Sequence, residues 1–277
     1  MADELKVGFV GGGSMAKALA KGFITTNTVR ASNIIASATT EKTLAVWKDM
    51  GCQTTLNNKE VVENSNVVFL AVKPYLIAPV AKEIKSSIDT SRHLVVSVAA
   101  AITTDVIEES LPPNTRVIRA NPNLACSVQC GALAFCKGRC TSAADVQLIK
   151  ILLQTSGMCV QVKESQMNAI TAVGGSALAF FFLAIEAMSD GGVRVGLPRA
   201  LSTDLATQTV LGAARLVQET GKHPAQLKDE VCSPGGTTIA GIQTLERAAF
   251  RSCFIDAVDS TTKRAAEIAE LQRSKGK

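Results

Sequence analysis

The sequence predicts an α/β protein, in which a doubly wound sheet is followed by an all-helical domain. Apolar strands alternate with helical segments through the first half of the chain. A glycine run, Gly11–Gly13, joins the first strand to the first helix, and no convincing strand follows residue 163. The chain has 277 residues, enough for two domains at roughly 150 residues each. We therefore predict domains at residues 1–163 and 164–277.

The first domain is predicted from its apolar runs. Val67–Val72 and Leu94–Ser97 are continuously apolar, as strands covered on both faces of a parallel sheet are. The expected strands are Leu5–Val10, Asn33–Ala38, Val67–Val72, Leu94–Ser97, Arg116–Ala120, Gly131–Cys136 and Met158–Val162. The expected helices are Met15–Thr25, Glu41–Met50, Tyr75–Lys85, Asp105–Ser110 and Ala143–Thr155. This alternation is typical of a Rossmann-type sheet with right-handed crossovers.

The second domain is expected to be helical throughout. The expected helices are Glu164–Ala187, Ser202–Glu219, Thr237–Arg247 and Ala249–Arg273. Gly191, Gly192, Gly196 and Pro198 are expected in a connection between helices. The apolar residues Phe180–Leu183 cannot all face one small core. They predict either packing against another subunit or one fully buried helix.

Composition and charge argue against several classes of protein. The net charge is only +5, and no cluster of Lys and Arg is interleaved with aromatic residues, which disfavours nucleic-acid binding. No uninterrupted apolar stretch reaches the roughly 18–20 residues of a membrane span. The N-terminal residues lack the pattern of a secretory or transit signal. A soluble cytoplasmic protein is the expectation.

The eight cysteines are expected to be thiols, because no secretory signal is seen. The spacing of Cys126, Cys130, Cys136 and Cys140 does not match a zinc knuckle, and no metal site is expected. Of the two histidines, His93 is expected at the surface or at its boundary with the core, and His223 in a loop or at a helix start.

The segment Val7–Ala16 predicts a dinucleotide site, because it has a strand, a glycine turn and a helix start. Gly11 permits the tight turn, and Gly13 removes a side chain that would block phosphates. The helix N-terminus offers free backbone N–H groups to the anion. The predicted cofactor-binding residues here are Val10, Gly11, Gly12, Gly13, Ser14 and Met15.

The end of the second strand favours NADPH, with NADH as the alternative. Folds specific for NAD usually carry Asp or Glu there, about 20 residues beyond the glycines. This chain has Ser37, Thr39 and Thr40 instead, followed by Lys42, and these side chains would not repel a 2′-phosphate. Glu41 is expected in the first turn of the next helix, where the helix dipole favours it.

Two further strand ends are predicted to face the cofactor, because ligands bind beyond the carboxyl ends of parallel strands. One strand delivers a lysine and a proline to this edge, and the other ends in small residues that would let a flat ring approach. The predicted residues are Ala71, Val72, Lys73, Pro74, Ala99 and Ala100.

The run Ser233–Thr238 predicts an anion site at a second helix start. Ser233 is expected to cap the helix, and Pro234 to occupy its first position. Gly235 and Gly236 would then leave backbone N–H groups exposed. A capped helix does not otherwise need both glycines, since each costs roughly 1 kcal/mol in a helix interior.

Together these motifs resemble the Δ1-pyrroline-5-carboxylate reductase family. The resemblance rests on four runs and extends to about residue 271: Val10–Ala16, Ala71–Pro74, His223–Leu227 and Ser233–Thr238. The run Leu111–Arg116 and the short C-terminus are most like the short cytosolic animal form.

The resemblance implies reduction of a cyclic imine to L-proline with NADPH or NADH, in dimers formed through the helical domain and often assembled into decamers. It implies that Asn58 contacts the adenosine part of the cofactor and that Asn123 lies near it. Thr238 and Ser233 are the catalytic candidates, and the substrate-binding candidates are Gly235, Gly236, Thr237, Thr171 and Ser176. A protonated imine already accepts hydride, so neither a metal nor a Ser/His/Asp triad is expected.

The chain also departs from the family pattern. A serine, two glycines and usually a proline are replaced within Thr171–Phe180, and a family Pro-Asn-Thr-Pro run is here Pro122–Ala125. Two alternatives stay open, the first because of these departures and the second because of the similar plan of a Rossmann domain followed by helices. One is a cofactor-binding assembly protein without activity or with altered specificity. The other is a dehydrogenase of the 3-hydroxyacid type, although Asn168 and Thr171 stand where that class carries a lysine.

Overall fold

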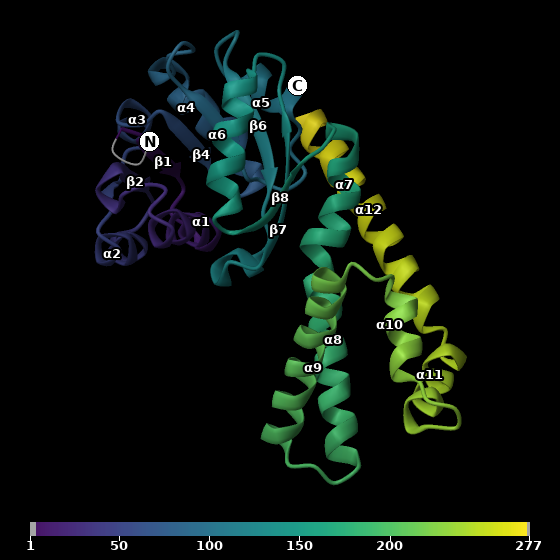
Figure 1. Cartoon of the computed structure of the whole chain (residues 1–277). Coiled ribbons are helices and arrows are strands. Elements are labelled where there is room, and N and C mark those ends of the chain that lie inside the picture. The colour runs from purple at the N-terminus through teal and green to yellow at the C-terminus, as the bar shows by residue number, and fades with distance from the viewer. Residues whose placement is uncertain (1–3, 276–277) are drawn as a thin grey trace. The chain divides into compact units, whose positions relative to one another are not determined.

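The computed structural model describes residues 4–275 and separates into two compact units. The first unit comprises the described residues up to Ser176 together with those from Ser260 onward, and the second comprises Ala177–Asp259 (Figure 1). The α/β class, with a helical C-terminal region, is confirmed. The boundary predicted at residue 163 follows the last strand, which ends at Gln161, and it stays a prediction as a functional division.

An eight-stranded sheet forms the centre of the first unit, in the order β3-β2-β1-β4-β5-β6-β7-β8. All neighbouring strands are parallel except β6 and β7, which are antiparallel. The strands are β1 (Val7–Val10), β2 (Ile34–Ser37), β3 (Gln53–Thr55), β4 (Val67–Leu70), β5 (Leu94–Ser97), β6 (Arg116–Asn121), β7 (Gly131–Lys137) and β8 (Gly157–Gln161). The strand order reverses direction at β1, the switch point where ligands bind in open α/β sheets.

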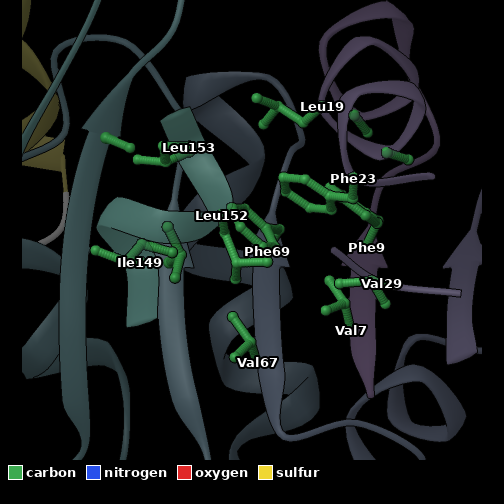
Figure 2. Packing of buried hydrophobic residues seen from close by; sticks show 14 of the residues in the cluster. Val7, Phe9, Leu19, Phe23, Val29, Val67, Phe69, Ile149, Leu152 and Leu153 are labelled. Carbon is green, nitrogen blue, oxygen red and sulfur yellow. The ribbon is translucent and has the colours of Figure 1, made fainter. Parts of the chain in front are cut away.

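Helices cover both faces of this sheet. They are α1 (Ser14–Thr25), α2 (Glu41–Asp49), α3 (Asn58–Glu63), α4 (Ile77–Ile84), α5 (Thr104–Ser110) and α6 (Ala143–Gln154). One buried cluster joins residues of α1 and α6 to one face of the sheet, and a second joins α3, α4 and α5 to the other. Figure 2 shows the first cluster, in which the rings of Phe9 and Phe69 stack with centroids 4.9 Å apart. The burial of these apolar side chains stabilises the unit and holds the strand ends in place.

Two short elements of the first unit were not predicted. β3 has three residues and only partial burial, so it lacks the apolar run that identified the other strands. α3 has six residues and begins after Asn57, whose side chain accepts a hydrogen bond from the backbone N–H of Lys59. The prediction for His93 was also wrong. Its ring is buried, and its Nδ1 accepts a hydrogen bond from the Asp89 N–H at 2.9 Å.

A buried ion pair ties β6 to the segment that follows β8. Arg119 is 2% exposed and its guanidinium contacts Glu164, at the start of the short helix η5 (Glu164–Gln166). The Glu164 carboxylate also accepts hydrogen bonds from Thr104 and from the Cys136 thiol. Burial and the nearby Glu164 carboxylate raise the pKa of Cys136 to about 12. Through the Glu164 carboxylate, this cluster therefore joins β6, β7 and α5 to the segment that follows β8.

The remaining segments are helical, as predicted. In the first unit they are α7 (Met167–Ile170) and the π-helical segment η6 (Thr171–Ser176). In the second unit they are α8 (Ala177–Arg194), α9 (Arg199–Thr220), α10 (Pro224–Val231) and α11 (Thr237–Arg247), followed by α12 (Phe250–Lys275), which extends into the first unit. His223 caps α10, since its Nδ1 accepts from the Ala225 N–H at 3.2 Å, as expected of a residue at a helix start.

The prediction that Gly191 and Gly192 lie in a connection was wrong, because α8 continues to Arg194. α8 and α9 lie side by side (Figure 1). A Cβ at Gly192 would overlap the Ser202 side chain, whose hydroxyl is held by the Ser189 carbonyl at 2.8 Å. Gly192 therefore permits close packing of the two helices.

We expect Gly192→Ala to lower the free energy of unfolding by about 1–2 kcal/mol, because the added methyl overpacks the contact between α8 and α9. Gly191→Ala is the matched control, since a Cβ there meets no atom within 4 Å. That change should be neutral or should stabilise by up to about 1 kcal/mol, through helix propensity. Chemical denaturation of both variants measures the difference. Equal effects at the two positions would contradict the packing role of Gly192.

The helical stretch Glu164–Arg194 is long and apolar enough, by length and composition, to cross a membrane. The sequence prediction of no membrane span relied on the lack of an uninterrupted apolar run of sufficient length. The helix meets the criterion by its length and mean hydropathy instead. This criterion is weak support for a span, because helices of soluble proteins also meet it. The second unit also exposes large apolar side chains of α8 and α9, such as Phe182, Leu183 and Leu205.

Candidate active site

A cleft of about 990 Å³ opens beyond the carboxyl ends of β1, β2, β4 and β5 in the first unit. Its volume suits a small-molecule ligand of the size of a dinucleotide. Most of the predicted cofactor-binding residues line it: Gly11, Gly12, Gly13, Ser14, Met15, Ser37, Asn58, Ala71, Val72, Lys73, Pro74, Ala99 and Ala100. The structure thus brings together four strand ends that are far apart in the sequence.

The glycine turn has the geometry that a phosphate cradle needs. Gly11 has φ +98°, and a Cβ there would lie 2.9 Å from the Ala71 carbonyl oxygen. Gly12 is held by Trp47, whose indole Nε1 donates to the Gly12 carbonyl at 3.1 Å. Gly13 precedes α1, and a Cβ there would meet no atom within 4 Å. The space above Gly13 is therefore open to a ligand.

The N-terminus of α1 presents backbone N–H groups to this space. In the part of the chain that the structure describes, no side chain caps the helix. Ser14 and Met15, the first helical residues, line the cleft. Free N–H groups and the helix dipole favour an anion at this position. The residues present therefore fit the pyrophosphate of a dinucleotide.

Ser37 ends β2 and links the glycine turn to Asn58. Its hydroxyl accepts a hydrogen bond from the Gly11 N–H at 3.3 Å and donates to Asn58 Oδ1 at 2.6 Å. The Asn58 amide in turn donates from Nδ2 to Glu83 at 2.9 Å. Ser37 is buried and Asn58 half-buried, so this relay fixes the orientation of the Asn58 amide at the cleft wall.

The other polar residues predicted near the end of β2 have different surroundings. Thr39 lines the cleft. Thr40 caps α2, since its hydroxyl accepts from the Thr43 N–H at 3.3 Å. Lys42 is exposed and is not among the residues that line the cleft. Lys73 and Glu83 are the charged side chains among the described residues that line it.

Val10 and Asn123 do not line the cleft, and their assignment to the cofactor stays a prediction. Val10 is buried in β1, and its carbonyl accepts from the Ala71 N–H at 2.9 Å. Asn123 is buried and donates from Nδ2 to the Gly174 carbonyl at 2.7 Å.

The substrate-binding candidates Thr171 and Ser176 lie in the π-helical segment η6. π-Helical turns inside α-helices often mark functional sites. Asn121, at the end of β6, donates to the Thr171 hydroxyl at 3.1 Å, and Asn123 holds Gly174 in the same segment. Thr171 and Ser176 are both half-buried. The two asparagines thus attach η6 to the sheet edge.

The run Ser233–Thr238 lies in the second unit, and the prediction that Ser233 caps a helix was wrong. The Gly236 N–H donates to the Ser233 carbonyl at 3.0 Å, which closes a β-turn with Pro234 and Gly235 at its centre. Gly235 has φ +68°, as the third position of a type II turn requires. α11 spans Thr237–Arg247, as the helix prediction has it, and its N-cap is Gly236 instead of Ser233.

The turn itself explains both glycines. A Cβ at Gly236 would overlap the Ser233 side chain, and Gly235 has a positive φ. The glycine pair therefore no longer argues for an anion site by itself. The helix start remains suited to one, because no side chain among the described residues caps α11. Thr237 is exposed and Thr238 half-buried in its first turn.

Several residues of the cleft were not predicted. They come from the 3₁₀ segment η2 (Pro74–Leu76), from α4, from the 3₁₀ segment η4 (Leu124–Val128) and from the loop before α3, and they are Leu76, Pro79, Val80, Glu83, Leu124, Ser127 and Leu56. Leu124 is 61% exposed and lines the cleft. The signal that could have found η4 is the departure at Pro122–Ala125 from the family pattern.

Comparison with known protein families gives two matches. The family described as pyrroline-5-carboxylate reductase dimerisation matches residues 164–268. The family described as NADP oxidoreductase, coenzyme F420-dependent, matches residues 6–101. The two matches therefore fall on the helical C-terminal region and on the sheet with the cleft.

The relatives and solved structures agree with these matches. Mouse pyrroline-5-carboxylate reductase 3 is 42% identical over 98% of this chain and 98% of its own. The structure of a pyrroline-5-carboxylate reductase from Coxiella burnetii has a TM-score of 0.90 and is 34% identical, covering 96% of this chain and 98% of its own. The structure of Plasmodium falciparum pyrroline carboxylate reductase with NADP bound has a TM-score of 0.88 and is 27% identical, covering 97% of this chain and 100% of its own.

Proposed function

This chain belongs to the pyrroline-5-carboxylate reductase family, and from that premise we infer that it reduces Δ1-pyrroline-5-carboxylate to L-proline with NADPH. The observation that carries the inference is a match to mouse pyrroline-5-carboxylate reductase 3 over 98% of both chains, in a chain whose sheet domain holds a cleft large enough for a dinucleotide. The chain is an oxidoreductase of proline biosynthesis. The fold and the similarity to mouse and bacterial enzymes point to the same reaction.

The cleft residues divide the binding of NADPH among them. The N–H groups at Gly13, Ser14 and Met15 would hold the pyrophosphate, and Asn58 the adenosine part. The small residues Ala99 and Ala100 leave the sheet edge open to a flat ring. When bound, the cofactor supplies the hydride that reduces the imine carbon.

We place the substrate carboxylate at the start of α11. Three properties of this site support the assignment: free N–H groups at the helix start, the dipole of an eleven-residue helix, and hydroxyls at Ser233, Thr237 and Thr238. Thr238 is the group proposed to hydrogen-bond the ring nitrogen of the imine. Thr171 and Ser176 of η6, in the first unit, stay substrate-binding candidates by the family resemblance, and both are half-buried. Because a protonated imine accepts hydride directly, positioning accounts for most of the catalysis.

We propose that the protein is a homo-oligomer, which the dimerisation family matched at residues 164–268 supports. We propose that the dimer forms through the helical domain and that dimers assemble into decamers. The exposed apolar side chains of α8 and α9 support a subunit contact there. We also propose a cytoplasmic location and no membrane or nucleic-acid partner. Multi-angle light scattering gives the assembly mass, and a monomeric mass at micromolar concentration would exclude the dimer.

The reaction is tested by steady-state assay of the purified protein with pyrroline-5-carboxylate and either NADPH or NADH. We expect cofactor oxidation matched by L-proline formation. Tight NADPH binding without turnover on a panel of cyclic imines would favour the non-catalytic assembly protein instead. Turnover of 3-hydroxyacids with NADP+ or NAD+, and none of imines with the reduced cofactors, would favour the dehydrogenase alternative.

We expect Thr238→Ala to lower kcat/KM for pyrroline-5-carboxylate by roughly 10- to 100-fold, the effect of losing one hydrogen bond to a charged or reacting group. Thr238→Ser should restore most of the activity, because it keeps the hydroxyl. Thr244→Ala is the matched control, since that hydroxyl donates only to the Ala240 carbonyl of its own helix. Full activity of Thr238→Ala would exclude the proposed role of this hydroxyl.

A further inference from the structure

Glu83 brings a carboxylate to the end of β2, where the sequence itself has none. Glu83 lies in the last turn of α4, lines the cleft and is exposed. Its Oε2 accepts from Asn58 Nδ2 at 2.9 Å, and Asn58 Oδ1 accepts from the Ser37 hydroxyl at 2.6 Å. The carboxylate is therefore two hydrogen bonds from the residue that ends β2.

This position matters for the choice between NADPH and NADH. In dinucleotide-binding folds, the acidic residue at the end of the second strand binds a ribose hydroxyl and selects NAD. Here the strand end is a serine, and a different helix supplies the acid to the same part of the cleft. The absence of Asp or Glu from the β2 end therefore does not leave this part of the cleft without negative charge.

Residues of α4 form one wall of the cleft, and two charged side chains of the cleft lie along it. Lys73 lies just before this wall, and Glu83 lies at its far end. Lys73 follows β4, whereas Glu83 is hydrogen-bonded to Asn58, the residue that we propose to contact the adenosine part of the cofactor. A 2′-phosphate adds negative charge on the adenosine side, close to the carboxylate. NADH carries only a hydroxyl there.

We propose that Glu83 is a specificity-determining residue of the cofactor cleft, which tolerates NADH and limits the preference for NADPH. The proposal rests on the proposed function, since it assumes that the cleft binds both cofactors. Its carboxylate disfavours the 2′-phosphate by charge and accepts a ribose hydroxyl. The hydrogen bond to Asn58 keeps that carboxylate on the adenosine side.

Glu83→Gln tests the proposal, because glutamine keeps an oxygen acceptor for Asn58 and removes the charge. We expect the ratio of kcat/KM for NADPH to that for NADH to rise about fivefold, the effect of removing one charge from near another in a solvated site. Isothermal titration calorimetry with 2′,5′-ADP and 5′-AMP isolates the adenosine side without turnover. The affinity ratio of these two ligands should shift by a similar factor in favour of 2′,5′-ADP.

Two further variants make the test decisive. Glu63→Gln is the matched control, because Glu63 is a carboxylate of α3 that accepts from Ser87 Oγ at 3.0 Å and does not line the cleft. It should leave both ratios unchanged. Glu83→Lys should shift both ratios further in the same direction, and it serves if the glutamine variant does not fold. Unchanged ratios in folded Glu83 variants that still reduce the imine would overturn the proposal. Loss of turnover in the wild type would instead overturn the proposed function.

Discussion

We expect Gly13→Asp to weaken NADPH binding by at least 100-fold while leaving the protein as stable as the wild type. Gly13 is the N-cap of α1, and a Cβ there meets no atom within 4 Å, so the substitution causes no internal clash. Aspartate is a favoured N-cap residue, which should keep or slightly raise the stability. Its carboxylate would occupy the N–H groups proposed to hold the pyrophosphate and would repel the phosphates. A 100-fold loss corresponds to about 2.7 kcal/mol.

The measurement pairs NADPH titration with thermal unfolding. Trp47 is the single tryptophan of the chain, and its indole is hydrogen-bonded to the glycine turn, so its fluorescence reports on the site. Gly13→Asn is the matched variant that separates bulk from charge, and it should lose less affinity than Gly13→Asp. Gly11→Ala should behave in the opposite way and lose stability, because of its φ of +98° and the contact with Ala71. If Gly13→Asp bound NADPH with an affinity within threefold of the wild type, the pyrophosphate would not bind at this turn.

We expect Glu164→Ala to lower the free energy of unfolding by about 3 kcal/mol at pH 7. The change leaves the buried Arg119 guanidinium without its ionic partner, which is the costly way to break a buried pair. It also removes the acceptor of Thr104 and Cys136. Because the Glu164 side chain is 33% exposed, we expect the low end of the usual cost of breaking a buried ion pair. Glu109→Gln, which removes an exposed carboxylate of α5, is the control and should change stability by less than about 0.5 kcal/mol.

The destabilisation caused by Glu164→Ala should be larger at neutral pH than at acidic pH. Burial alone would raise the pKa of Glu164, but the charge of Arg119 and the hydrogen bonds from Cys136 and Thr104 lower it below the ordinary 4.5. A carboxylate with a lowered pKa in the folded state stabilises the fold above its unfolded pKa and loses that contribution as pH falls. The gap between wild type and Glu164→Ala should therefore be full at pH 7 and should shrink below pH 4.5. Urea denaturation across this range measures it, and a gap that is constant with pH would contradict the ionic role.

Much of the fold could be predicted because long apolar runs identify buried strands. β1, β4 and β5 are buried at every residue, and the predicted strands overlap all three. β3 and α3 could not be found in the same way, because they are short and partly exposed. The capping prediction at Ser233 failed for a different reason. Ser-Pro-Gly-Gly suits a capped helix start and a type II turn equally well, and only the backbone distinguishes them.

The candidate site also contains residues that could be predicted from the sequence and residues that could not. Residues at strand ends could be predicted, because parallel strands bring their carboxyl ends to one edge of a sheet. Glu83 and Leu124 could not, because they come from the last turn of α4 and from η4, whose approach to the cleft depends on tertiary packing. Ser37 illustrates both cases. It lines the cleft as predicted, yet its hydroxyl is already engaged with Gly11 and Asn58.

We propose that the start of α1 binds the cofactor pyrophosphate and that the start of α11 binds the substrate carboxylate. The most direct test compares kcat/KM for pyrroline-5-carboxylate with that for Δ1-pyrroline, the same imine without the carboxylate. With saturating NADPH, we predict at least a 100-fold preference for the carboxylated imine, which corresponds to one charged group held at a helix start and by hydroxyls. Equal kcat/KM values for the two imines would contradict the account, because the start of α11 would then contribute nothing to substrate recognition.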